Sequence, residues 1–166
     1  MSNYTRYRVP GASYFFTVNL AVRGGDLLIR RIDALRSAYA TTMRDLPVRC
    51  DAMVVLPDHI HAVWTLPPGD SDYSERWRKL KHRFSRAVDV EMGRSASKLR
   101  KRERGIWQRR FWERTIRDET EWAAHVRYVW TNPVKHGLVQ RPAEWEFSSI
   151  HDAIRAGRVS SEWSGG

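Results

Sequence analysis

An α+β fold built on an antiparallel sheet is predicted from the order of elements along the chain. Four segments rich in β-branched and aromatic residues are typical of strands. Three further segments have apolar residues at helical spacing. The resulting order is strand, helix, strand, strand, helix, strand, helix, which forms two split β-α-β units. We therefore expect a ferredoxin-like sheet with helices packed mainly on one face, and a single domain over residues 1–166.

The first half of the chain is predicted to supply three strands and one helix. Residues 13–22, "SYFFTVNLAV", form the first strand, and a Gly-Gly pair follows it. Residues 32–46 place five apolar side chains on one face of an amphipathic helix. Residues 47–66 predict a hairpin that turns at Pro57 and Asp58.

A second amphipathic helix is predicted over residues 74–92. Either Ser74 or Asp72 can cap its first turn, because a side-chain oxygen at that position accepts an unpaired backbone N–H. Residues 93–104 have little apolar content, and we expect a mobile basic loop there.

The rest of the chain is predicted to add a strand, a helix and a C-terminal arm. Residues 106–117 indicate the fourth strand. The last helix can begin at Asp118 or Thr120, and Pro133 is expected to limit it, since the residue before a proline disfavours the helical region. Residues 140–166 predict a packing arm with a short helix.

The composition excludes several classes of protein. Cys50 is the only cysteine, which excludes a disulfide framework and a cysteine-based zinc finger. The N-terminal residues lack the apolar core of a signal peptide, and no apolar run approaches the length of a membrane span. We expect a cytoplasmic protein with no membrane partner.

The charge is concentrated in one segment. The net charge is +10, and residues 76–117 hold 16 of the 29 Lys and Arg residues but only 4 of the 19 Asp and Glu residues. Such a surface attracts a polyanion, with nucleic acid as the first candidate. The alternative is a solvated charged helix followed by a flexible loop.

Two histidines lie one residue apart in the third predicted strand. Side chains two apart in a strand share a face, so His59 and His61 can direct ring nitrogens at one metal ion. The spacing alone is weak evidence, because surface or packed histidines are the more common case. A metal site would need a third ligand from another element.

The last predicted helix carries candidates for that ligand and for a nucleophile. His125, Tyr128 and Asn132 are spaced i, i+3 and i+7, which places them on one face. A tyrosine oxygen beside a metal ion can attack phosphorus. The alternative is that Tyr128 packs in the core beside Val126 and Val129.

Three blocks of the chain resemble a known family. "LPDHIHAVWTLPPGD", "GIWQRRFWERTIRDE" and "HVRYVWTNPVKHGLV", in this order, resemble the REP-associated tyrosine transposases. These are relatives of the single-tyrosine transposases of insertion sequences, in the superfamily of single-strand endonucleases named for a His-hydrophobe-His motif. The resemblance covers residues 6–152, and it departs from the family's pattern at Trp130 and Glu146.

The resemblance implies a site and a reaction. His59 and His61 match the metal-binding pair, Asn132 matches the third ligand with His125 as the alternative, and the ion is Mg²⁺ or Mn²⁺. Tyr128 matches the nucleophile that cleaves single-stranded DNA and forms a 5′-phosphotyrosine. The family's substrates are hairpins of repetitive extragenic palindromic (REP) DNA, and we expect a nucleoid-associated monomer rather than a dimer.

Contacts to DNA are predicted in the basic segment. Trp107, Phe111 and Trp112 can stack on bases or fill the core. Three rival functions stay open at this point: a hairpin-binding protein without physiological nuclease activity, a replication initiator with the same chemistry, and a basic RNA-binding protein. The predicted DNA-binding residues are Arg76, Lys79, Arg83, Arg86, Arg100, Lys101, Arg102, Arg104, Arg109, Arg110 and Arg114.

Overall fold

A four-stranded antiparallel sheet organises the molecule. The computed structural model describes residues 5–91 and 105–166. The strands are β1 (Ser13–Asn19), β2 (Arg49–Val55), β3 (His59–Thr65) and β4 (Trp112–Ile116), in the spatial order β2-β3-β1-β4. The α+β class and the antiparallel sheet predicted from the sequence are confirmed.

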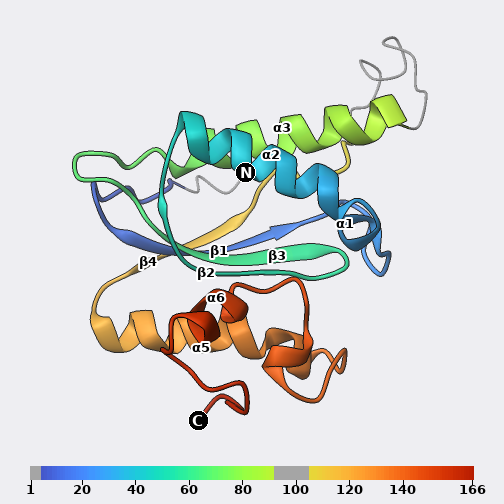
Figure 1. Ribbon diagram of the computed structural model, residues 1–166. Helices are drawn as coiled ribbons and strands as arrows, with labels where there is room; N and C mark the ends of the chain where they lie inside the picture. Colours follow the sequence, from blue (N-terminus) through green and yellow to red (C-terminus); the bar gives the residue numbers. More distant parts are fainter. Residues whose placement is uncertain (1–4, 92–104) are drawn as a thin grey trace.

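Helices cover both faces of the sheet (Figure 1). On one face lie α2 (Ile32–Asp45) and α3 (Tyr73–Glu91), with the short α1 (Leu27–Arg30) beside them. On the other face lie α5 (Glu119–Lys135) and α6 (Ile150–Arg155). The expectation that helices pack mainly on one face therefore needs correction.

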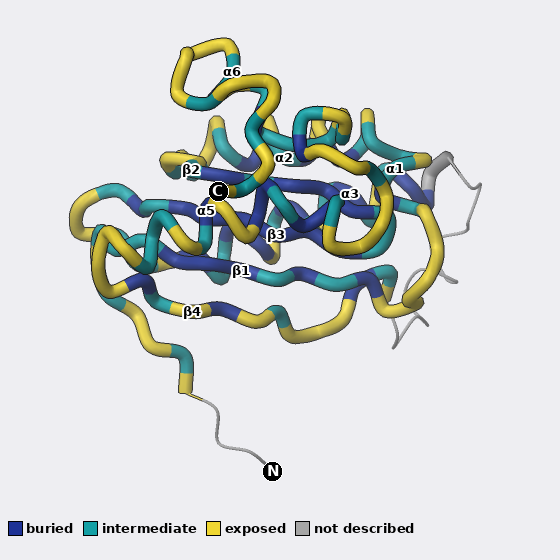
Figure 2. The backbone as a smooth tube through the Cα atoms, turned by 90° about the horizontal axis from the view of Figure 1, so that it is seen from below, coloured by how far each residue is buried: buried dark blue, intermediate teal, exposed yellow. Residues whose placement is uncertain are grey.

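Two hydrophobic clusters explain this arrangement. On one face Phe16 of β1 packs with Trp77 of α3, and on the other Phe15 packs with Val129 of α5. Neighbouring residues in a strand point to opposite faces, so a strand that is apolar at successive positions needs a cover on each side. Six of the seven residues of β3 are buried, whereas in β4, at the sheet's edge, buried residues lie between exposed or half-buried ones (Figure 2).

The helix α5 extends further than predicted. Asp118 is its N-cap and accepts the backbone N–H of Glu121. The helix continues through Pro133, which is buried, and ends at Lys135. Because Pro133 has no backbone N–H, one helical hydrogen bond is missing. The carbonyls of the last turn can still be capped, and the backbone N–H of His136 donates to the carbonyl of Asn132.

The C-terminal residues pack on β2 and α5. The 3₁₀ helix η1 (Pro142–Glu144) precedes Trp145, whose Nε1–H donates to the carbonyl of Val55. Ser149 accepts the backbone N–H of Met53 and the indole N–H of Trp130. These contacts cover part of the free edge of β2, which would otherwise present unpaired backbone groups.

Candidate active site

His59 and His61 lie together on the face of the sheet that α5 covers. Their register pairs His59 with Asn19 and His61 with Thr17. Both side chains are buried, and their ring centres are 4.9 Å apart. The same-face geometry expected from their spacing is therefore present.

Each imidazole has a partner at Nδ1. His59 Nδ1 is 2.7 Å from Asp58 Oδ1, and His61 Nδ1 is 2.9 Å from Thr17 Oγ1. The second oxygen of Asp58 accepts the backbone N–H of Gly24 and pairs with Arg23. With Nδ1 engaged, the Nε2 atom of each ring is the one left to bind a metal, as is usual for metal-ligating histidines.

Burial favours the neutral form of both rings. It lowers the pKa of His59, although the carboxylate of Asp58 opposes this effect. It also lowers the pKa of His61 to about 3, and the neighbouring His59 adds to the effect. A neutral imidazole is the form that binds a metal ion, so at neutral pH no proton has to be displaced.

Tyr128 contacts this pair from α5. Its ring centre is 5.4 Å from that of His61 and 5.6 Å from that of Phe15. Tyr128 is 37% exposed, while its neighbours Val126 and Val129 are buried. The valines therefore fill the core, while Tyr128 is partly exposed and packs against His61.

Asn132 lies one turn beyond Tyr128 and is fully buried. Neither its Oδ1 nor its Nδ2 has a hydrogen-bond partner among the described residues. A buried, unpaired amide costs about 1–3 kcal/mol, so an oxygen ligand for an ion is a fitting use of this side chain. The residues present therefore fit a divalent metal with two imidazoles and one amide oxygen.

His136 was not among the residues singled out in the sequence. Its ring centre is 5.2 Å from that of His59. The signal was available, since His136 follows Asn132 by four residues and Tyr128 by eight, which keeps all three on one face of a helix. In residues 5–91 and 105–166, however, no group of three His, Cys, Asp or Glu side chains could hold a metal ion, so His136 does not complete such a group with His59 and His61.

His125 lies towards the other end of α5. Its ring centre is 4.9 Å from that of Phe15, and its Nδ1 bonds to the backbone carbonyl of Glu121. The contacts of the His125 ring are thus with Phe15 and its own helix. This placement favours Asn132 over His125 as the third ligand.

Arg76 does not belong to a DNA-binding surface. It is 1% exposed, and its guanidinium donates to the carboxylate of Asp70 and to the carbonyls of Leu46, Pro47 and Asp72. The prediction that it contacts DNA is wrong, because the half-buried carboxylate of Asp70 and three backbone carbonyls enclose its guanidinium. Its role is to join α3 to the end of α2.

The other basic residues that were predicted to contact DNA differ in how exposed they are. Arg83 is half-buried and bonds to Thr42 and Asp45. Lys79 is half-buried, and Arg86 is exposed. The predictions for Arg100, Lys101, Arg102 and Arg104, and for the loop 93–104, fall outside the described residues. Arg109, Arg110 and Arg114 are exposed, and Arg114 pairs with Glu121.

The three aromatic residues that were predicted to stack on bases or fill the core have separate roles. Trp107 is buried against Phe84, and Phe111 packs on Phe16 in the core. Trp112 is 53% exposed and meets Phe15 edge-on, with ring centres 5.8 Å apart. It pairs with Thr17 across β1 and β4, so it lies on the same face as His61 and Tyr128.

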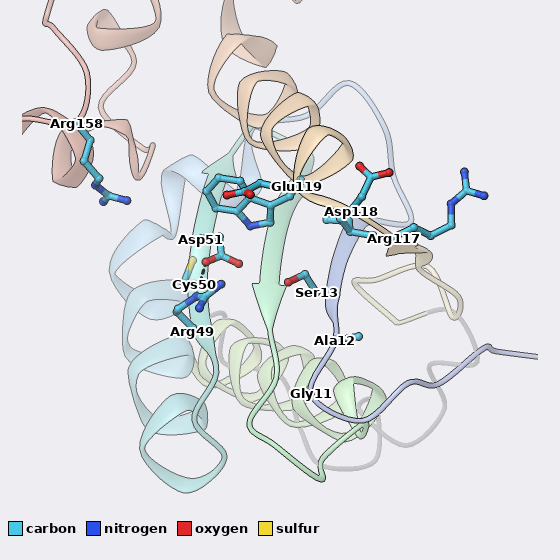
Figure 3. Close-up of a pocket in the computed structure, with 12 residues that line it drawn as sticks. Gly11, Ala12, Ser13, Arg49, Cys50, Asp51, Arg117, Asp118, Glu119 and Arg158 are labelled. Carbon is cyan, nitrogen blue, oxygen red and sulfur yellow. Dashed lines mark hydrogen bonds and ion pairs between the residues drawn. The ribbon is translucent and has the colours of Figure 1, made fainter.

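A separate cleft lies at the opposite end of the sheet from the histidine pair (Figure 3). It has a volume of about 860 Å³ and is lined by residues that include Ser13, Arg49 and Arg158. Ser13 pairs with Thr65, whereas His59 pairs with Asn19 at the far end of β1, so the cleft is separate from the histidine pair. Asp51 in this cleft is already engaged by Arg49 and Thr65.

No helix in the described part of the chain is long and apolar enough to cross a membrane.

Comparisons with known proteins identify the family. No family model matches the chain. A REP-associated tyrosine transposase of Escherichia coli K12 is 41% identical over 165 residues, which are 99% of this chain and 92% of the relative. A putative REP-associated tyrosine transposase of Haemophilus influenzae is 41% identical over 166 residues, covering 99% and 94%.

A solved structure agrees with these relatives. It is a REP-associated tyrosine transposase bound to a REP hairpin, with a TM-score of 0.88 and 42% identity, covering 100% of this chain and 93% of that one. Identity at this level over nearly the whole of both chains establishes common descent as well as a common fold. The chain belongs to the family of REP-associated tyrosine transposases.

Proposed function

We propose that the protein is a metal-dependent endonuclease and strand transferase that acts on hairpin-forming REP DNA, with Tyr128 as the nucleophile. The observation that carries the proposal is the contact between Tyr128 and His61, with the unpaired amide of Asn132 one turn further along the same helix. The hairpin in the related structure supports the choice of substrate.

The reaction is a transesterification. The oxygen of Tyr128 attacks phosphorus in the single strand and gives up its proton, the bond from phosphorus to the 3′ oxygen breaks, and a 5′-phosphotyrosine forms. The departing 3′ oxygen takes up a proton and becomes a hydroxyl. A 3′-hydroxyl can later attack the phosphotyrosine and release the tyrosine, so strands are joined without an external energy source.

The three proposed ligands hold the metal, which is Mg²⁺ or Mn²⁺. When bound, the ion supplies charge that polarises the phosphate. His59, His61 and Asn132 come from a rigid strand and a packed helix, so the same two elements fix the ligands and the nucleophile. Asp58 and Thr17 hold the two imidazoles in the orientation that leaves Nε2 available.

Single-stranded DNA beside the site would meet an aromatic and basic surface. Trp112 presents an exposed indole on the same face as Tyr128, and an unpaired base can stack on it. Arg109 and Arg110 precede it and are exposed, so they can contact phosphates.

The test is formation of a covalent protein–DNA product. The protein is incubated with an end-labelled REP hairpin strand and Mn²⁺, and the products are separated under denaturing conditions. We expect a labelled adduct with the wild type and none with His59→Ala or His61→Ala. Tight hairpin binding by the wild type with no adduct in any metal would instead support a binding protein without nuclease activity.

A further inference from the structure

Lys135 lies in the last turn of α5 and reaches back over the nucleophile. Its Nζ is 4.9 Å from the centre of the Tyr128 ring, and the residue is exposed. The two residues are seven apart, which brings them to the same helix face. Lys135 is therefore close to the ring of the proposed nucleophile.

The charge of Lys135 is not neutralised by a neighbour. Over residues 5–91 and 105–166, no carboxylate forms an ion pair with it, and its contact is with the aromatic ring. Two other cations around the site differ, because Arg114 is paired with Glu121 and Arg23 with Asp58. An exposed ammonium above a phenol is placed to receive an anion from outside the protein.

The proposed reaction needs such a cation. A phosphodiester carries one negative charge, and attack by a tyrosine oxygen brings a second one to the phosphorus. We propose that Lys135 is a catalytic residue that contacts a non-bridging oxygen of the scissile phosphate and neutralises charge while Tyr128 attacks. This inference rests on the proposed function, because it assumes that Tyr128 is the nucleophile.

Two simpler roles make different predictions. A lysine in the last turn stabilises the helix dipole, and an ammonium over a ring can hold that ring in place. Either role would alter the unfolding temperature or the packing of α5. Neither role predicts that another cation at this position restores the rate of the chemical step while DNA affinity and stability stay the same.

The experiment compares Lys135→Met with Lys135→Arg in single-turnover cleavage. Protein is in saturating excess over a labelled REP hairpin strand with Mn²⁺, and the rate of adduct formation is measured with hairpin affinity, Mn²⁺ affinity and unfolding temperature. Arg44→Met is the matched control, because Arg44 is an exposed cation on α2, on the other face of the sheet.

We expect Lys135→Met to slow adduct formation about 10- to 100-fold. Lys135→Arg should recover most of the rate, Arg44→Met should match the wild type, and hairpin and Mn²⁺ affinities should stay within about two-fold. An unchanged rate in Lys135→Met would overturn the assignment. So would a lower rate that arises from lost hairpin affinity alone, or one that Lys135→Arg does not recover.

The outcome is separable from failure of the proposed function. If the wild type forms no adduct, or Tyr128→Phe forms one as fast as the wild type, the proposed function fails and the role of Lys135 fails with it. If the wild type and Tyr128→Phe behave as expected while Lys135→Met is fully active, only the role of Lys135 is rejected.

Discussion

The ring of Tyr128 on α5 meets the ring of His61 on β3 at 5.4 Å between centres, with the planes 71° apart. One element is a helix and the other a central strand, and they are joined by the buried ring of Phe15, which contacts both. The spacing between the proposed nucleophile and the proposed metal ligand is thus set by core packing. Substitutions that leave this packing intact should therefore change metal binding, DNA binding or the cleavage rate one at a time.

Replacing Asn132 with Leu should raise or preserve the stability of the metal-free protein. The buried amide has no partner among the described residues, and removing it relieves a cost of about 1–3 kcal/mol. The same change should abolish the increase in unfolding temperature that Mn²⁺ gives the wild type. Thermal unfolding with and without Mn²⁺ checks both. If the free energy of unfolding of the metal-free protein fell by more than about 2 kcal/mol, the amide of Asn132 would already be paired in the wild type.

Replacing Asp58 with Asn should weaken Mn²⁺ binding. The neutral amide is a poorer acceptor for the Nδ1–H of His59, and loss of such an outer partner typically lowers metal affinity about 10- to 100-fold. Calorimetric titration with Mn²⁺ at neutral pH measures the change. Asp33→Asn is the matched control, because Asp33 is an exposed carboxylate on α2. Equal Mn²⁺ affinities in the two variants would show that Asp58 does not support the metal site.

Two arginines of the basic segment should behave in opposite ways. Arg76→Met should lower the free energy of unfolding by about 3 kcal/mol, because it removes the donor to three carbonyls and leaves the carboxylate of Asp70 with the backbone N–H of Asp72 in place of a buried guanidinium. Its hairpin affinity, measured on folded protein, should not change. Arg110→Met should leave stability within about 0.5 kcal/mol of the wild type.

The effect of Arg110→Met should appear in binding. Affinity for single-stranded DNA should fall, and the slope of log affinity against log salt should become shallower by about 0.7 for the lost phosphate contact. Anisotropy titrations at several salt concentrations measure the slope. An unchanged slope would place the phosphate contacts elsewhere on the surface.

Glu121 should make stability depend on acid pH. Its carboxylate accepts the backbone N–H of Arg117 and a bond from Arg114, which lowers its pKa to about 2 from an ordinary value of 4.5. Below pH 4.5 the carboxylate of Glu121 takes up a proton more readily in the unfolded chain than in the folded protein. Its contribution to the free energy of unfolding is therefore complete above pH 4.5 and is lost as the pH falls towards 2. Glu121→Gln should therefore unfold at a lower temperature than the wild type at pH 7, and the gap should narrow between pH 4.5 and 2. A gap that is constant over this range would show that the charge of Glu121 is not involved.

The sheet, the long helices and the core of the site followed from local pattern. Runs of aromatic and β-branched residues predicted the strands around Phe15 and His61, and i, i+3 and i+7 spacing predicted the shared face of Tyr128 and Asn132. These features depend on residues close in the sequence. The family resemblance then indicated which of the possible chemistries to expect.

The features that sequence patterns missed depend on contacts between distant residues. Nothing local distinguishes Arg76 from the exposed Arg86, and it is the cage of Asp70 and Pro47 that buries it. Covering of both faces of the sheet is an exception, because successive apolar residues in β1 and β3 already indicate strands that are buried on both sides. His136 lies beyond the proline at which the helix was expected to end, and so its approach to His59 was missed.

The most direct test is to identify the tyrosine that carries DNA after cleavage. The adduct formed with a REP hairpin and Mn²⁺ is digested, and the peptide with the nucleotide mass is sequenced by mass spectrometry. We predict that the mass lies on Tyr128, and that Tyr128→Phe forms no adduct while it binds the hairpin and Mn²⁺ as the wild type does. Tyr73 should not react, because it is fully buried on the other face, where burial raises its pKa to about 12. A nucleotide mass on any other tyrosine, or an undiminished adduct in Tyr128→Phe, would contradict the assignment of the nucleophile.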